Sequence, residues 1–202
     1  MATVDDGTLW RRAQEGDETA FGVLFERYAA SIHSYCFRRT GDWALAEDLT
    51  SVTFLECWRH RSRVRLDAGE VLPWLYGVAR NVTRNSARSR RRYASALARI
   101  PCESGEADFA ERVAERVSSE RRVRDLLSSL EELPPRELDA VVLVCWQGLS
   151  HAEAAFALEV PEATVRSRLF RARRRLARAG EAESEAESCH RDVALQDEGG
   201  PR

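Results

Sequence analysis

The stretch from 148 to 179 constrains the fold of this chain more than any other. It reads GLSHAEAAFALEVPEATVRSRLFRARRRLARA. Ser150, followed three residues later by Glu153, is a capping-box pair, in which a hydroxyl and a carboxylate satisfy free backbone amides where a helix begins. Pro161 suits the first position of a second helix, because its missing N–H costs nothing there. The stretch therefore predicts two helices joined by a tight turn.

The second of these helices carries apolar residues on one face and arginines on most other positions. The apolar stripe is Val165, Leu169, Ala172 and Leu176. A merely solvated amphipathic helix would normally mix positive and negative charges, and Glu162 is the only acid here. We therefore favour a helix-turn-helix whose second helix lies in the major groove of DNA, with side chains on base edges and on phosphates.

The charges of the chain are segregated, although the net charge is only -2. Arginine concentrates at 80–92 and 166–178, whereas acids gather at 103–120 and after 180. Such local basic patches, and not the total charge, indicate nucleic-acid binding. All 31 basic residues are arginine, which fits a GC-rich coding bias as well as a chemical need.

Helical periodicity also organises the first half of the chain. A short helix is expected over 9–14, and a long one that Asp17 caps and Gly41 ends. Asp42 caps a third helix, which ends near residue 60. A loop of mixed charge over 61–73 then precedes another long helix.

That next helix, expected from 74 to 92, has an apolar face opposite a row of arginines and asparagines. Aromatic rings that stack on unpaired bases, together with guanidinium groups that follow the backbone, are what binding of single-stranded DNA requires. The alternative is that the rings belong to the core, and Trp74 fits that interpretation equally well. The candidate residues on this helix are Trp74, Tyr76, Arg80, Asn81, Arg84, Asn85 and Arg88.

The fold class that follows is all-α, with two small helical domains. The first spans 8–92, and a flexible linker over 93–118 is poor in apolar residues. The second domain, 119–179, contains four helices and includes the helix-turn-helix. The tail, 180–202, is acidic and expected to be disordered.

Several functions are excluded by what the sequence lacks. Five cysteines and four histidines show no paired zinc-ligand spacing, so no metal and no cofactor are expected. Cys36, Cys57 and Cys145 are expected in or near the core. No glycine-rich phosphate loop or nucleophile elbow is present, which argues against an enzyme. There is no signal peptide and no apolar run of about 20 residues, so we expect a cytoplasmic protein without membrane insertion.

Two stretches resemble conserved regions of bacterial sigma factors. ELPPRELDAVVLVCWQGLSHAEAAFALEVPEATVRSRLFRARRRL resembles the fourth region, and AEDLTSVTFLECW followed by PWLYGVARNVTRNSARSRRR resembles the second. As an ordered pair they are specific, and they cover the chain from about 9 to 179. The chain is identified as a member of the extracytoplasmic-function (ECF) group of the sigma-70 family.

This resemblance implies a specificity subunit that directs core RNA polymerase to particular promoters and helps to melt them. The helix matching 46–58 would bind core polymerase, with Asp48, Leu49 and Phe54 as contact candidates. The stretch 63–85 would open and capture the minus-10 element. Arg63 and Arg65 join the minus-10 candidates, and the loop before Pro73 would hold an extruded base, at a cost of a few kcal/mol.

The second domain would read the minus-35 element. The resemblance assigns Arg166, Ser167 and Phe170 to base-facing positions, and Arg171, Arg173 and Arg174 to contacts with phosphate or polymerase. Such factors are commonly held by an anti-sigma protein, which makes one a further expected partner.

The chain departs from the family pattern at two places that matter. Ser51 and Val52 stand where a glutamine and an acid are usual, which removes a polar pair from the polymerase-binding face. Glu159 stands where glycine is common, so the turn is reached without glycine's freedom at positive φ.

The alternative function is a stand-alone helix-turn-helix regulator that binds duplex DNA tightly without polymerase. The arginine row at 80–91 argues against it, because a sensor domain needs no second nucleic-acid face.

Overall fold

The computed structural model describes residues 4–97 and 133–178, and its regular elements in both ranges are helical. The first range contains α1 (Asp6–Gln14), α2 (Glu18–Thr40), α3 (Trp43–His60), short 3-10 helices at Arg61–Arg63 and Ala68–Glu70, and α4 (Val71–Leu97). The second contains α6 (Pro135–Val141), a π-helical turn (Val142–Trp146), α7 (His151–Leu158) and a helix over 162–178. The all-α prediction is confirmed. Most of the predicted linker, the start of the second domain and the acidic tail lie outside the described residues.

The predicted caps delimit α2 and begin α3. The carboxylate of Asp17 accepts from the amide of Ala20 at 3.0 Å, and Asp42 accepts from Leu45 at 3.0 Å. Gly41 ends α2 at φ 65° and donates its N–H to Phe37. The expected start of α1 at residue 9 is wrong, because Asp5 already caps a polar first turn that carries no apolar periodicity.

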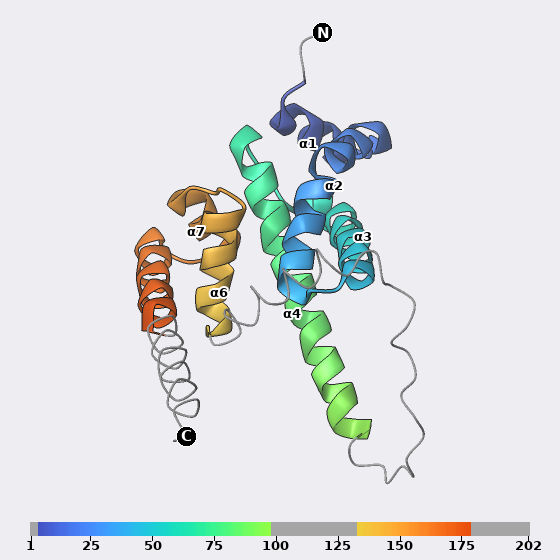
Figure 1. Cartoon of the computed structure of the whole chain (residues 1–202). Coiled ribbons are helices and arrows are strands. Elements are labelled where there is room, and N and C mark those ends of the chain that lie inside the picture. Colours follow the sequence, from blue (N-terminus) through green and yellow to red (C-terminus); the bar gives the residue numbers. More distant parts are fainter. Residues whose placement is uncertain (1–3, 98–132, 179–202) are drawn as a thin grey trace, which may run out of the picture.

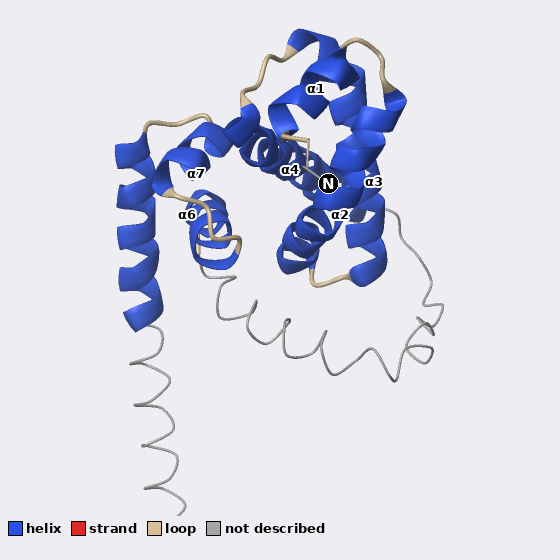
Figure 2. Ribbon diagram, turned by 90° about the horizontal axis from the view of Figure 1, so that it is seen from above, coloured by secondary structure: helices blue, strands red, loops and turns tan. Residues whose placement is uncertain are grey.

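The long helix α4 lies between two groups of helices (Figures 1 and 2). It begins at Val71 and continues to Leu97, so it is longer than the predicted 74–92 at both ends. One continuous cluster of buried apolar residues joins α1, α2, α3 and α4 to α7 and the π-helical turn. The second domain therefore packs directly on α4, and helix patterns alone did not predict this contact.

The closest approach between α4 and α7 occurs at Gly77. A Cβ atom at this position would lie 2.9 Å from the carbonyl oxygen of Ala157, a separation that real Cβ atoms essentially never show. The Tyr76 hydroxyl donates to Oε1 of Gln147 at 2.9 Å beside it. These contacts fix α4 against α7 at a distance that only glycine permits.

Cysteine burial partly agrees with expectation. Cys36 and Cys57 are buried, and burial raises the pKa of both thiols. Cys145 is exposed, so its expected place in or near the core is wrong: the π-helical turn rotates it to the surface. Within the described ranges, no group of three or more metal-ligating side chains comes together, and none of the helices there has the length and apolarity to span a bilayer.

Replacing Gly77 by alanine should separate the two domains. The new methyl group must displace the α7 backbone, and such overpacking typically costs about 1–3 kcal/mol. We expect a larger radius of gyration than wild type by small-angle X-ray scattering, with helical content retained. Gly22→Ala is the matched control, because a Cβ at this helical glycine meets nothing within 4 Å. An unchanged radius for Gly77→Ala would contradict the packing described here.

Candidate nucleic-acid interface

The helix-turn-helix begins with the predicted capping box. Oγ of Ser150 accepts from the amide of Glu153 at 3.2 Å, and Oε2 of Glu153 accepts from the amide of Ser150 at 2.7 Å. The hydrogen bonds to Ser150 hold the pKa of Glu153 below its usual range. The first helix of the motif is therefore fixed at its start by two reciprocal bonds, as the sequence indicated.

The turn is made by a residue in the left-handed region. Glu159 adopts φ 53° and ψ 47°, and is the only non-glycine residue with positive φ in the described ranges. Its amide donates to Phe156, and the next amide donates to Ala155, which closes the end of α7. Left-handed backbone costs an ordinary L-residue about 1–2 kcal/mol. The turn thus carries the strain that the missing glycine predicts.

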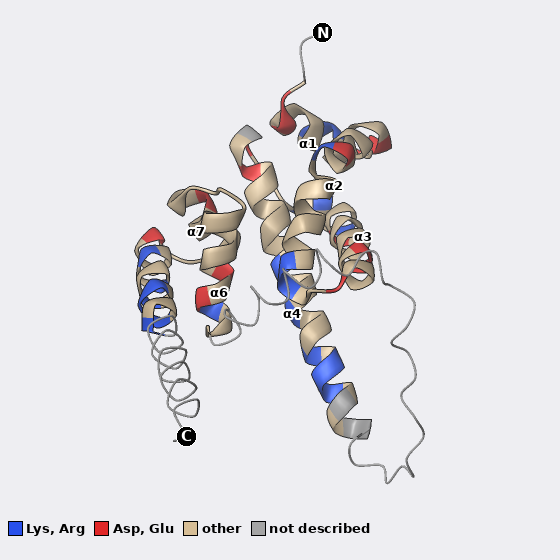
Figure 3. Ribbon diagram, viewed as in Figure 1, with Lys and Arg blue, Asp and Glu red and all other residues tan. Residues whose placement is uncertain are grey.

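The helix over 162–178 exposes every residue predicted to contact the minus-35 element. Val165 and Ala172 are buried beneath it, in agreement with the predicted apolar stripe. The exposed set is Arg166, Ser167, Phe170, Arg171, Arg173 and Arg174. In Figure 3 the ribbon of this helix is coloured blue, for arginine, at repeated positions along its length.

A buried carboxylate orients this helix, and sequence reasoning missed it. Glu137 of α6 is only 6 % exposed, and it pairs with Arg171 at 3.4 Å and with Arg175 at 3.1 Å. Arg171 is therefore exposed to solvent and at the same time forms an ion pair with Glu137 of the same protein. The only sequence signal was an acid in the first turn of α6, which by itself indicates helix capping.

The candidates on α4 fall into two groups. Asn81, Arg84, Asn85 and Arg88 are exposed along the middle of α4, and the end of this helix extends away from the other helices (Figures 1 and 3). Arg84 and Arg88 line one cavity with other arginines. Asn81 lines a different cavity, between α4 and α7, to which Glu159 also contributes.

The other α4 candidates are covered. Tyr76 is buried against Tyr35, with ring centroids 5.6 Å apart, so in this arrangement it cannot stack on a base. Trp74 is half-buried against Trp10 at 4.9 Å, which supports the core alternative for this ring. Arg80 is bound to a carboxylate of the second domain. In this arrangement the Tyr76 ring belongs to the core, and its stacking on a base stays a prediction.

The loop before α4 is exposed where it was predicted to bind DNA. Arg63 and Arg65 both face solvent. The carbonyl oxygen of Val64 between them accepts from Nε1 of Trp10 at 3.0 Å, and Nε2 of Gln14 donates to the same oxygen at 2.6 Å. The loop is thereby fixed to α1, beside a cavity of about 570 Å³ that Arg65 helps to line.

The polymerase candidates on α3 separate by burial. Asp48 is exposed, whereas Leu49 and Phe54 belong to the core, where they support the helix and do not face a partner. Two apolar residues that the sequence reasoning did not select, Val52 and Leu55, are exposed on the same helix. Their signal was available, since they lie four and seven residues after Asp48 on one helical face.

A helix-turn-helix domain packed on a helical domain with its own arginine-rich helix defines a class of transcription initiation factor. The Sigma-70 region 2 family model matches residues 24–93, and the Sigma-70, region 4 model matches residues 124–176. The chain belongs to the sigma-70 family, in its ECF group. It is a sigma factor that directs RNA polymerase to promoters, not an enzyme.

Characterised relatives cover most of the chain. It is 34% identical to ECF RNA polymerase sigma factor BldN of Streptomyces coelicolor over 84% of its length, but spans only 64% of BldN. It is 32% identical to RNA polymerase sigma-H factor of Pseudomonas aeruginosa, with 86% of this chain and 93% of the relative covered. For ECF RNA polymerase sigma-E factor of Escherichia coli the identity is 32%, with 83% and 90% covered.

Solved structures share the fold. CnrH, in complex with the cytosolic domain of CnrY, matches with a TM-score of 0.65 at 24% identity, over 88% of this chain and 97% of CnrH. The sigma factor RpoE of Bartonella quintana, solved with the anti-sigma factor NepR, matches with a TM-score of 0.59 at 22% identity, over 77% and 93%. At these identities the likeness concerns the fold alone.

Relief of the strain at Glu159 should stabilise the second domain. Glu159→Gly removes the left-handed penalty, and allowing for the greater freedom of glycine in the unfolded chain we expect a gain of about 1 kcal/mol. Urea unfolding measures it. The matched control is Glu162→Gly, which places the same change at a helical φ and should lose about 1 kcal/mol. A loss for both variants would show that Glu159 is not strained.

The buried Tyr76 hydroxyl should make stability depend on alkaline pH. Desolvation raises the pKa of Tyr76 from 10.0 to about 12. Folding thus favours the neutral phenol, and this contribution is complete below pH 10 and lost as the pH rises from 10 to 12. The chain has no lysine, and arginine stays charged throughout. Urea unfolding at several pH values measures this effect. The free energy of unfolding should fall less steeply between pH 10 and 12 for Tyr76→Phe than for wild type, whereas the exposed substitution Tyr93→Phe should follow wild type.

Proposed function

We propose that this ECF sigma factor contacts its promoter through two separate surfaces, one on each domain. The observation that supports this best is the exposure of two arginine-rich helical faces, on α4 and on the helix over 162–178. A promoter has two elements separated along the duplex, and each surface suits one of them. The proposed domains are 8–92 and 119–179, joined by 93–118 and followed by the tail 180–202.

The second domain reads the minus-35 element in duplex form. Arg166, Ser167 and Phe170 face the bases, because they lie near the start of the second helix of the motif, which enters the major groove. Arg171, Arg173 and Arg174, further along the helix, contact phosphate or polymerase. The Glu137 carboxylate supports this role by fixing the rotation of the helix through Arg171.

The first domain opens and holds the minus-10 element. Asn81, Arg84, Asn85 and Arg88 follow the backbone of the single strand, and Arg80 joins them once the second domain moves away. Base stacking by Trp74 and Tyr76 also requires these rings to leave Trp10 and Tyr35 of the first domain. Arg63 and Arg65 act at the loop, where the cavity of about 570 Å³ suits one extruded base. Removing a base from the stack costs a few kcal/mol, which pocket contacts must offset.

Core polymerase binds the exposed face of α3. Asp48 is the polar contact, and the exposed apolar pair Val52 and Leu55 supplies the area to be buried. Leu49 and Phe54 hold this face in shape from below. Because Val52 replaces the acid usual in the family, we propose an interface that is more apolar and less dependent on salt.

The remaining partners and the location follow from the family. We propose that the protein works in the cytoplasm, where polymerase and promoter DNA are found, and that an anti-sigma factor restrains it. RpoE was solved with the anti-sigma factor NepR, and CnrH with the cytosolic domain of CnrY.

Run-off transcription from a pool of promoter fragments tests this function with purified core polymerase. We expect initiation at defined sites only when the protein is present. Arg166→Ala should weaken closed binding by about 1–3 kcal/mol, and Arg84→Ala should impair melting without changing site choice. Arg12→Ala, an exposed change on α1 in a pair with Asp17, is the charge-matched control. If core polymerase is indifferent while the protein alone footprints duplex DNA, the chain acts as a stand-alone regulator.

A further inference from the structure

A single carboxylate of the second domain is inserted between two arginines of the first. Asp139 of α6 is 1 % exposed. Its Oδ2 accepts from Nε of Arg80 on α4 at 2.7 Å, and its Oδ1 lies 3.2 Å from Nη2 of Arg39 at the end of α2. The side chains of Arg39 and Arg80 are only 10 % and 12 % exposed. Three elements from both domains therefore meet at one ionic junction.

This junction holds more positive than negative charge. Arg168, from the buried side of the helix over 162–178, is 8 % exposed. Burial lowers its pKa, and the nearby charges of Arg80 and Arg136 lower it further. Nε of Arg39 and Nη1 of Arg168 are buried and have no hydrogen-bond partner in the described part of the chain. Buried charges are costly unless they are paired, so the arginines favour a further anion.

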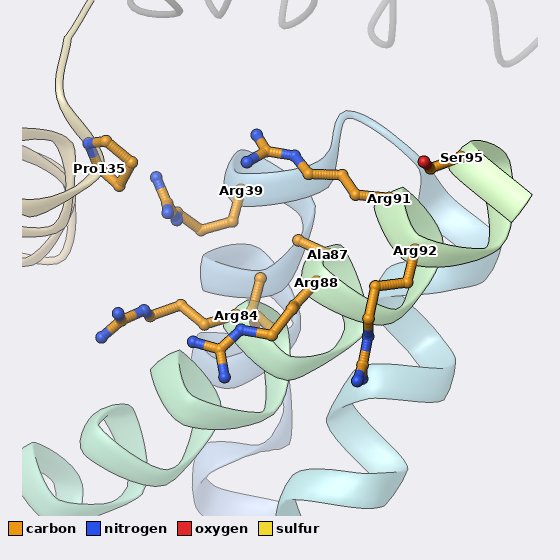
Figure 4. A pocket seen from close by; sticks show the side chains of 9 residues that line it. Arg39, Arg84, Ala87, Arg88, Arg91, Arg92, Ser95 and Pro135 are labelled. Atoms are coloured by element: carbon orange, nitrogen blue, oxygen red, sulfur yellow. The ribbon is translucent and has the colours of Figure 1, made fainter.

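The junction continues into an arginine-lined cavity of about 630 Å³. Figure 4 shows Arg39 of α2 beside Arg84 and Arg88 of α4, with Pro135 of the second domain at the edge. Among the described residues, no acid lines this cavity. Arg39 thus connects the buried junction to the exposed basic row on α4, and the whole surface could follow one nucleic-acid backbone.

We propose that Arg39 and Arg80 form a phosphate-binding site for single-stranded promoter DNA, and that Asp139 occupies this site as an internal substitute for phosphate. A guanidinium binds carboxylate and phosphate oxygens with the same geometry, so the two anions compete for the same donors. Docking of the second domain and capture of the melted strand therefore exclude each other. The inference rests on the proposed function, because the ligand is the minus-10 strand.

Arg39 was not among the residues expected to bind DNA. It lies on α2, outside the stretch that resembles the minus-10 reader, and it reaches α4 only through the fold. Asp139 has the opposite role. It belongs to neither DNA surface, yet it blocks one of them while the domains are docked.

The test uses the full chain and a fluorescein-labelled 20-nucleotide single-stranded DNA of mixed sequence. Asp139→Asn keeps the shape of the side chain and removes its charge, which leaves the two arginines unpaired and favours the undocked form. We expect about tenfold tighter binding by fluorescence anisotropy at low salt, together with a larger radius of gyration by scattering. Glu26→Gln removes one charge from an exposed site that makes no ion pair within the described ranges, and its affinity should match wild type.

A second substitution identifies the phosphate site itself. In the Asp139→Asn background, Arg39→Ala should reverse most of the gain and lower the slope of log affinity against log salt by about 0.7, the value for one phosphate contact on a single strand. Arg80→Ala should do the same. Arg59→Ala in that background removes an equal charge from the exposed end of α3 and should leave the slope unchanged.

Three results would overturn the proposal. One is an undocked Asp139→Asn protein that binds the strand no more tightly than wild type. Another is tighter binding that neither Arg39→Ala nor Arg80→Ala reduces, since the arginines then hold the domains together without binding phosphate. If Asp139→Asn fails to fold, Gly77→Ala replaces it as the undocked form, and wild-type affinity for that variant would count equally against the site.

Transcription with core polymerase separates this inference from the function on which it rests. If the wild-type protein initiates at defined promoters but the variants bind the single strand with equal affinity, the phosphate site is refuted and the proposed promoter function stands. If substitutions at Asp139 and Arg39 change the affinity for the single strand but no promoter-dependent initiation occurs, the proposed promoter function is refuted instead.

Discussion

The burial of α4 between two domains is the constraint on which the rest of the structure depends. One face of α4 completes the core of the first domain, and Gly77 allows α7 to approach another. The same helix carries the residues assigned to the melted promoter strand. In the proposed function, packing and DNA binding therefore compete for one helix, and its residues divide between the two according to the face on which they lie.

Local structure was largely predictable because it depends on nearby residues. The caps at Asp17 and Asp42, and the capping box at Ser150, act within three residues of themselves, so each is visible in the sequence. The same holds for the helix-turn-helix and for the exposure of its arginines other than Arg168, which is buried. The strain at Glu159 was predictable as well. A position at which the family favours glycine indicates a positive φ, and a glutamate adopts this backbone angle only at a cost in free energy.

The docked arrangement was not predictable from these patterns. Helical periodicity identifies which face is apolar, but it does not identify what covers a polar residue on the edge of that face. Arg80 and Asp139 are 59 residues apart in the chain, and Tyr76 and Gln147 are 71 apart. Arg80 thus has the same sequence signature as exposed Arg84, although one is bound inside the protein and the other is free to bind DNA. Leu49 and Phe54 show the converse, because a family motif combines contact residues with the core residues that support them.

The domains meet through an apolar contact and an ionic junction, and the two respond differently to salt and to competing anions. The apolar contact around Gly77 is insensitive to salt, and without it the second domain would not lie close enough for Asp139 of α6 to reach Arg80 and Arg39. The ionic junction orients the second domain on the first but adds little net stability, because desolvation of the buried charges offsets most of their attraction. An excess of buried arginine lowers its contribution further. The docked state is therefore held mainly by packing, whereas the choice between carboxylate and phosphate is decided at the arginines.

A ligand must favour one state by about 5.5 kcal/mol to reverse a 1:99 population completely. Core polymerase and the melted strand both act on the first domain, so their combined binding can supply this difference where neither contact would suffice alone.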